Sequence, residues 1–245
     1  MVRTARANAA RTRSVSESRA GTPWRRIIAE AILIFGSVYV AIFLEAASQD
    51  RKDAREAREA LAQVMAELRE DQRDLVEIRA NQEHSGELYN RTVRGLSAPG
   101  SVPGDSLTIA FRQLGEMNRT LYHRRSAWTT MVAAGQLADL DDPELVTLLG
   151  NLYENVSRRF EENGSQYDAQ VNRLALEWFP ETWDRVEHRL RRPDEAAVLR
   201  DRLLTMREAW NSYYLVMLSD YEDRIFEIID GIEVHLQRHG FETSP

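Results

Sequence analysis

Cysteine is absent from this sequence of 245 residues, and Lys52 is the single lysine among 32 basic side chains. Without cysteine the chain has no disulfide, no thiol nucleophile and no cysteine-ligated zinc. The preference for arginine over lysine is typical of a GC-rich genome, and we interpret the sequence as bacterial rather than assign the arginines a chemical role.

The usual catalytic motifs are also missing. The sequence has no His-Glu-x-x-His motif, no Gly-x-Ser-x-Gly motif and no glycine-rich phosphate loop. His84, His123 and His188 are isolated in the sequence. We therefore predict no enzymatic activity and no cofactor.

Two short patterns resemble metal sites but are incomplete. His235 and His239 are four residues apart, a spacing that can place two zinc ligands on one helix face, but no third ligand is apparent. The acidic stretch from 139 to 144 lacks the central glycine and alternate oxygen ligands of a calcium loop. Asp142 followed by Pro143 is instead typical of a helix start, and no metal is predicted.

Charge is divided unevenly along the chain. Residues 1–26 contain seven arginines and one glutamate, whereas the whole chain has a net charge of -7, so the remainder is strongly acidic. An acidic body argues against a nucleic-acid partner, because phosphate neutralisation needs a basic face. Residues 1–26 contain little that is large and apolar, and they are predicted to be a disordered, basic cytoplasmic tail.

The longest uncharged run lies near the N-terminus. Fourteen residues without charge separate Glu30 from Glu45, and the wider stretch 27–47 would span about 31 Å as a helix. This length matches the hydrocarbon core of a bilayer, so residues 27–47 are predicted to be a transmembrane helix. Its landmarks are an interfacial Trp24, the flanking charges Arg25, Arg26, Glu30 and Glu45, and the internal Gly36.

Two alternatives for this run remain open, namely a cleaved signal peptide and a buried helix of a soluble core. The residues after Leu44 offer no clean Ala-x-Ala cleavage site, and a soluble core helix would not explain the arginine-rich tail. Under the positive-inside rule, the tail predicts a single-pass protein of the bacterial inner membrane with a cytoplasmic N-terminus. Residues 48–245 would then form an extracytoplasmic domain.

The rest of the chain has helical periodicity and no strand-like alternation. After the span, Leu61, Leu68 and Leu75 recur every seven residues, although Asp71 interrupts the stripe. This segment is predicted to continue the span as a long amphipathic helix, either as a short coiled coil or packed in a bundle. Further helices are expected over 106–117, 126–134, 143–180 and 193–236, with a short one carrying Trp183 and Val186. The fold is therefore predicted to be all-α, with an irregular helical bundle after the span.

The sequence resembles a group of bacterial single-pass membrane proteins of uncharacterised function. The resemblance rests on Ala29-Glu30 and Gly36 in the span, on the stretch from Ala134 to Leu140, and on the leucine spacing that ends at Tyr153. It implies an inner-membrane anchor with an extracytoplasmic helical domain.

Aromatic residues in the C-terminal half are the remaining candidates for a ligand site. Trp178, Trp183, Trp210 and Tyr213 could line an aromatic pocket, although such a stripe can equally be core. The leading prediction is a membrane-anchored interaction or scaffold protein that binds a membrane protein partner or a second copy of itself. The alternative is a sensory or ligand-binding domain that works with a separate transducer.

Overall fold

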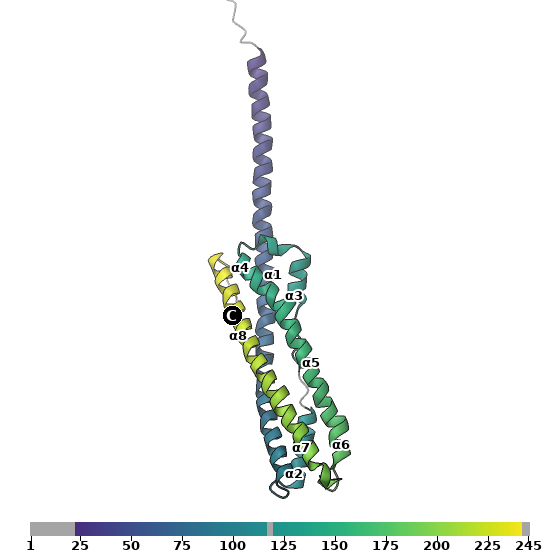
Figure 1. Ribbon diagram of the computed structural model, residues 1–245. Helices are drawn as coiled ribbons and strands as arrows, with labels where there is room; N and C mark the ends of the chain where they lie inside the picture. The colour runs from purple at the N-terminus through teal and green to yellow at the C-terminus, as the bar shows by residue number, and fades with distance from the viewer. Residues whose placement is uncertain (1–22, 117–119, 242–245) are drawn as a thin grey trace, which may run out of the picture. The chain divides into compact units, whose positions relative to one another are not determined.

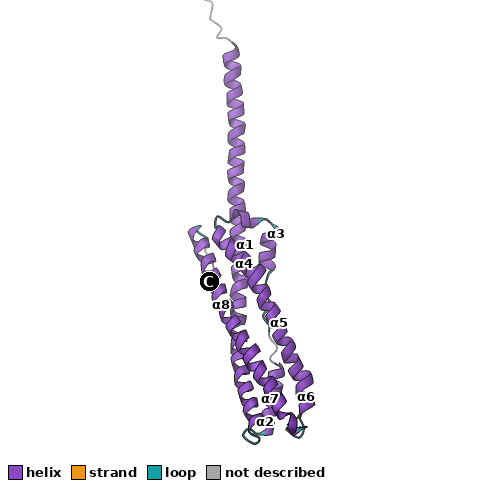
Figure 2. Cartoon of the chain, in the orientation of Figure 1, coloured by secondary structure: helices purple, strands orange, loops and turns teal. Residues whose placement is uncertain are grey.

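The computed structural model describes residues 23–116 and 120–241. Nearly all of them are helical, as Figure 2 shows, so the predicted all-α class is confirmed. The chain divides into two compact units, residues 1–51 and residues 52–245, which are called the first and second unit below.

The described part of the first unit belongs to helix α1 (Pro23–Ser97). The large apolar side chains between Trp24 and Leu44 are all between 51% and 75% exposed. This stretch is long and apolar enough to cross a membrane, with a mean hydropathy of 2.4 over an 18-residue window in which nothing is buried. The structure thus contains the predicted apolar helix, and none of its large side chains contributes to a protein core.

In the second unit, α1 buries the leucine stripe that the heptad spacing predicted. Leu61, Leu68 and Leu75 are all 1% exposed or less. Asp71, which interrupts the stripe, is also fully buried. Of the two packing modes that the sequence left open, the structure has the helical bundle, and α1 lies alongside the C-terminal helix α8 (Ser212–Arg238) in Figure 1. Ion pairs between Arg69 and Glu233 and between Arg79 and Glu222 join these two helices.

Short helices follow α1. They are α2 (Gly104–Glu116), α3 (Ser126–Ala133) and the 3-10 turn η1 (Gln136–Asp139). Between α3 and η1, Gly135 has a φ of 74°, which lies in the left-handed region that glycine adopts readily.

The second long helical stretch runs from Pro143 to Thr182. Its consecutive segments are α4 (Pro143–Asn151), η2 (Leu152–Val156), α5 (Ser157–Arg173), η3 (Leu174–Trp178) and α6 (Phe179–Thr182). The segments η2 and η3 are π-helical. Pro180, predicted to end or bend the helix, is the second residue of α6 and follows the π turn η3, and the helical stretch ends two residues later at Thr182.

A β-hairpin follows, and here the sequence prediction was wrong. Instead of a short helix carrying Trp183 and Val186, β1 (Trp183–Asp184) pairs antiparallel with β2 (Arg189–Leu190). The Oδ1 atom of Asp184 accepts hydrogen bonds from the backbone N–H groups of Val186 and Glu187, at 3.0 and 3.1 Å. This local turn satisfies backbone donors that a helix would otherwise satisfy.

The third long helical stretch completes the second unit. It comprises η4 (Pro193–Glu195), α7 (Ala196–Thr205), the π-helical η5 (Met206–Asn211) and α8. A serine follows two of the three π segments: the hydroxyl of Ser157 donates to the carbonyl of Leu152, and that of Ser212 to the carbonyl of Arg207. Each hydroxyl reinforces the i−5 backbone bond that defines the π turn.

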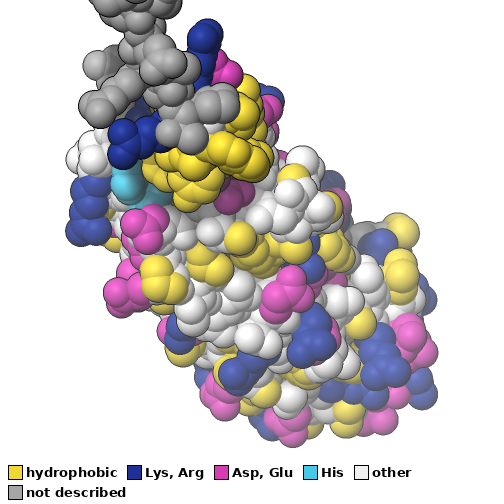
Figure 3. Space-filling model, turned by 90° about the horizontal axis from the view of Figure 1, so that it is seen from above, with side chains coloured by type: hydrophobic (Ala, Val, Ile, Leu, Met, Phe, Trp, Pro, Cys, Tyr) yellow, Lys and Arg dark blue, Asp and Glu magenta, His cyan; other side chains and the backbone are white. Residues whose placement is uncertain are grey.

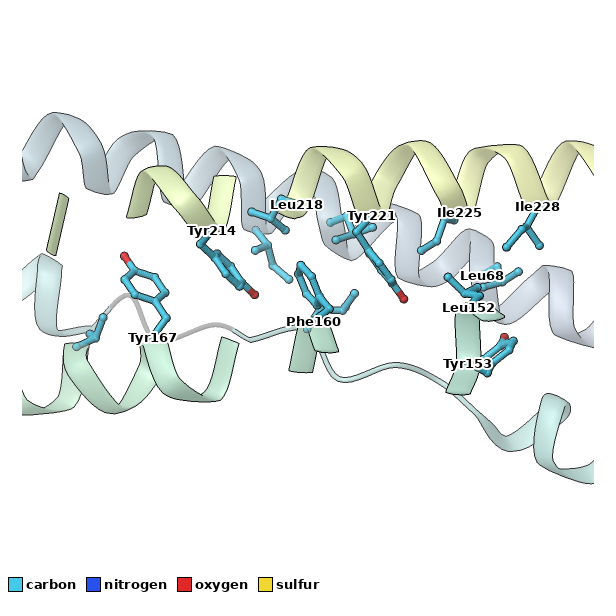
Figure 4. Close-up of a cluster of buried hydrophobic side chains, with 14 of the residues drawn as sticks. Leu68, Leu152, Tyr153, Phe160, Tyr167, Tyr214, Leu218, Tyr221, Ile225 and Ile228 are labelled. Atoms are coloured by element: carbon cyan, nitrogen blue, oxygen red, sulfur yellow. The ribbon is translucent and has the colours of Figure 1, made fainter. Parts of the chain in front are cut away.

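Aromatic rings fill the core where α5 meets α8, as Figure 4 shows. The ring of Phe160 stacks on Tyr221 at a centroid distance of 4.7 Å and lies 5.3 Å from Tyr214. Tyr167 lies 5.5 Å from Tyr214 and donates its hydroxyl hydrogen to Asn211 at 3.2 Å. These four rings are at most 2% exposed, so they are structural parts of the bundle.

Candidate functional site

The six landmarks of the predicted span all lie on α1 within the first unit, and all six are exposed. Arg26 donates from Nε to Oε1 of Glu30 at 3.1 Å, an exposed i,i+4 pair. A Cβ added to Gly36 would meet nothing within 4 Å. Trp24, Arg25 and Glu45 are exposed as well.

The four aromatic residues predicted to form a pocket are placed in different surroundings. Trp183 is buried against Phe111 and donates from Nε1 to the hydroxyl of Thr108 at 2.9 Å. Trp178 lies 4.8 Å beneath the guanidinium of Arg202. Trp210 packs, partly buried, against the core.

Only Tyr213 of these four lines the cavity that lies between the helical stretch α4–η2–α5 and helix α8. The volume of this cavity is about 560 Å³. Its lining residues are Asn151, Asn155, Val156, Arg159, Phe160, Tyr213, Val216, Met217, Asp220, Tyr221 and Arg224.

A buried polar network begins at Tyr221, directly behind the cavity. The Tyr221 hydroxyl lies 2.9 Å from Nδ1 of His123 and 3.3 Å from the hydroxyl of Ser157. His123 Nδ1 also lies 2.6 Å from Oδ2 of Asp71. The donors are all satisfied if Nδ1 donates to Asp71, Tyr221 donates to Ser157 and Ser157 donates to the carbonyl of Leu152. This arrangement assigns the proton of a neutral His123 to Nδ1.

The network holds residues 120–125, which precede α3, against α1. Nη1 of Arg124 donates to Asp71 at 2.6 Å and to Asp74 at 2.8 Å. The backbone N–H of Arg124 also donates to Asp71, at 3.3 Å. Hydrogen bonds to Asp74 and Asp71 raise the pKa of the Arg124 guanidinium above its ordinary value. Glu67 accepts from the N–H of Ala127 at 3.2 Å and so caps α3 from another helix. Carboxylates of α1 therefore replace the backbone partners that this segment lacks.

Sequence reasoning missed this network because His123 has no neighbours that indicate a role. The one signal was Asp71, a carboxylate at a position where the heptad spacing requires an apolar residue. The side chain of His123 is fully buried. We therefore assign the network to structure rather than to catalysis.

His235 and His239, the incomplete zinc pattern, lie with their ring centroids 4.8 Å apart. Nδ1 of His235 lies 3.4 Å from Oδ2 of Asp142, the residue that caps α4. Burial lowers the pKa of His235, and the neighbouring His239 lowers it further. Among residues 23–116 and 120–241, no group of three or more His, Asp or Glu side chains is placed to hold a metal ion.

The cap at Asp142 was predicted and is confirmed: Oδ1 accepts from the backbone N–H of Leu145 at 3.0 Å, and Pro143 occupies the first turn. This hydrogen bond lowers the pKa of Asp142. The stabilisation is therefore complete above the pKa of the unfolded chain and is lost as the pH falls through the lower folded pKa.

We expect Asp142→Ala to lower the free energy of unfolding by about 0.5–2 kcal/mol at neutral pH. The difference between variant and wild type should shrink on acidification, because the wild type then loses the charged cap. Urea unfolding at several pH values measures both effects. An unchanged difference down to the most acidic condition would contradict the role of the charge, and Asp141→Ala is the matched control on the neighbouring carboxylate.

Acidic and basic side chains are interspersed over the face of the molecule that Figure 3 shows.

Comparison of the chain with protein-family models, curated proteins and solved structures finds no match. The resemblance to bacterial single-pass membrane proteins therefore stays a prediction, and the function has to be argued from the two units themselves.

Proposed function

We propose that this chain is a single-pass protein of the bacterial inner membrane whose helical second unit lies outside the cytoplasm and binds a protein partner or a second copy of itself. Residues 27–47 act as the anchor. The function is one of interaction rather than of catalysis.

The exposed apolar stretch of α1 carries this proposal. Phe35 and Tyr39 are each 75% exposed, and the whole hydropathic window has no buried residue. Burial of one large apolar side chain contributes about 1.5–3 kcal/mol, so leaving thirteen of them in water would be very unfavourable. A lipid bilayer covers such a stretch completely, and the 21 residues from 27 to 47 match its thickness.

The orientation follows from charge. Seven arginines and one glutamate precede the apolar stretch, and the positive-inside rule retains such a segment in the cytoplasm. The acidic second unit is then translocated.

Protease accessibility tests the orientation. A tag is added after Pro245, and protease is applied to intact spheroplasts. We expect the tag to be digested, because the second unit lies outside. Protection of the tag until the cells are lysed would refute the orientation.

Crosslinking in cells tests the interaction. Full-length protein is crosslinked, solubilised in detergent and recovered through the tag for mass spectrometry. We expect a stoichiometric membrane protein or a crosslinked oligomer of the chain itself. Recovery of the chain only as a monomer, at native expression level, would refute the interaction role.

Gly36 provides a sharp test of the anchor. We expect Gly36→Arg to raise the free energy of insertion by about 2.5–3.5 kcal/mol, because it places a charge near the centre of the span. The fraction of protein that resists alkaline carbonate extraction should fall. Gly36→Ala is the matched control, since its added Cβ has no neighbour within 4 Å. Equal extraction of the two variants would argue against a span centred here.

A second candidate function is ligand sensing by the second unit. The observation that favours it is the cavity of about 560 Å³ between α5 and α8, to which Tyr213 contributes. In that role the second unit would work with a separate transducer.

A further inference from the structure

We propose that the cavity between α5 and α8 binds a small amphipathic carboxylate, meaning a single carboxylate group attached to an apolar body. This inference rests on the second candidate function, and it specifies the site and the chemical class of the ligand. It does not depend on the membrane anchor or on a protein partner.

The cavity has the size of a small-molecule site. Its volume of about 560 Å³ falls in the range of roughly 300–1,000 Å³ that is typical of such sites. Residues from the helical stretch α4–η2–α5 and from helix α8 line it, so the site exists only in the folded bundle.

Apolar and aromatic side chains form much of the lining. Phe160 and Tyr221 are 2% and 1% exposed, while Val216 and Tyr213 remain 67% and 43% exposed. The well-packed rings therefore form a fixed base and the exposed side chains form the edge. An apolar ligand body placed against these groups would remove both its own surface and theirs from water.

The base of the cavity is held in position before any ligand arrives. Tyr221 stacks on Phe160, and its hydroxyl lies within hydrogen-bond distance of buried His123 and Ser157. A rigid base lowers the entropic cost of binding, because these side chains have no freedom left to lose.

Two guanidinium groups indicate the charge of the ligand. Arg224 pairs with Asp220 at 3.2 Å, so this pair contributes no net charge. Arg159 is exposed, and no acidic partner is recorded for it in the part of the chain that the structure describes. The lining therefore has one net positive charge, which complements one carboxylate, and guanidinium groups bind carboxylates with two parallel hydrogen bonds.

Amide groups supply neutral polar contacts beside the arginines. Asn155 lies in the π turn η2 and donates from Nδ2 to Oδ1 of Asn151 at 3.1 Å, and both residues line the cavity. The π turn places Asn155 and Val156 at the cavity together, and π turns occur frequently at functional sites.

The test uses the full chain in phosphatidylcholine nanodiscs, with phenylbutyrate as the probe and phenylbutanol as its uncharged counterpart. Binding is measured by ligand-observed NMR titration. We expect saturable binding of phenylbutyrate with a Kd below about 1 mM and binding of phenylbutanol at least about tenfold weaker.

Variants of the cavity test the residue assignment. Arg159→Gln should weaken phenylbutyrate binding by about tenfold or more and leave phenylbutanol binding unchanged. Val216→Trp should weaken binding of both probes, because it fills the cavity from an exposed position that the fold tolerates. Arg200→Gln on α7 is the control, since Arg200 does not line the cavity and pairs with Asp201.

Three results would overturn the inference. They are equal affinity for the acid and the alcohol, no saturable binding of phenylbutyrate, and an Arg159→Gln variant that binds like the wild type. Flotation of the reconstituted protein with lipid is recorded on the same samples. Loss of flotation with intact probe binding would refute the anchor, whereas intact flotation without probe binding would refute the ligand site.

Discussion

Replacement of Asp71 by alanine is expected to lower the free energy of unfolding by about 3–5 kcal/mol, one of the two largest effects of a single substitution that we predict. The Asp71 side chain is fully buried and accepts hydrogen bonds from Arg124, while His123 Nδ1 lies 2.6 Å away. Its removal leaves a buried imidazole and the N–H of Arg124 without their acceptor.

The loss falls mainly on His123. The guanidinium of Arg124 keeps its ion pairs with Asp74 at 2.8 Å and Glu70 at 2.9 Å. In the described part of the structure, the hydroxyl of Tyr221 is then the only hydrogen-bond partner left for Nδ1 of His123. Chemical unfolding of the full chain in detergent, followed by tryptophan fluorescence, measures the effect. Trp128, which stacks on Tyr153 at 4.9 Å, is one of the reporters.

Asp74→Ala is the matched control for Asp71→Ala. Asp74 contacts the same guanidinium but is 47% exposed, so its removal should cost less than about 1 kcal/mol. Equal effects of the two substitutions would show that burial of Asp71 contributes nothing. In the double variant Asp71→Leu/His123→Phe we expect part of the stability to return, because no buried imidazole is then left without its acceptor.

Replacement of Phe160 by alanine is expected to lower the free energy of unfolding by a similar amount, about 3–5 kcal/mol. The ring is 2% exposed and lies between Tyr214 and Tyr221, as Figure 4 shows. Its deletion removes the contacts with both tyrosine rings and leaves a cavity where α5 meets α8. Urea unfolding compares the variant with the wild type.

Val216→Ala is the control for Phe160→Ala, since Val216 lines the same cavity but is 67% exposed. Its effect should stay within about 0.5 kcal/mol. A cost of Phe160→Ala below about 1.5 kcal/mol would contradict the expectation, because it would mean that the bundle closes over the lost ring.

The helices were predictable because their signals are local. Leu61, Leu68 and Leu75 repeat at the spacing of one helix face, and all three are buried. The cap formed by Asp142 and Pro143 also depends on neighbouring residues alone, and the structure contains it. The apolar stretch 27–47 is helical for the same reason, because every residue in it is compatible with a helix.

The hairpin at β1 and β2 was not predicted because its support comes from elsewhere. Trp183 and Val186 predict a short helix here, but Trp183 Nε1 donates to Thr108, which lies 75 residues away in the sequence. His188 Nδ1 contacts the same hydroxyl at 2.8 Å. Long-range contacts of this kind leave no periodic trace in the sequence.

By itself, the sequence determined the all-α class, the apolar helix and its basic flank, the cap at Asp142 and the buried leucine stripe, because each depends on the spacing of residues close together in the chain. Only the tertiary structure decided what Asp71 does and which aromatic residue lines the cavity. Asp71 meets His123 across 52 positions, and Tyr213 faces the cavity with Phe160 across the boundary between two helices. Such pairings arise when long helical stretches pack against one another, and no local pattern of residue types specifies them.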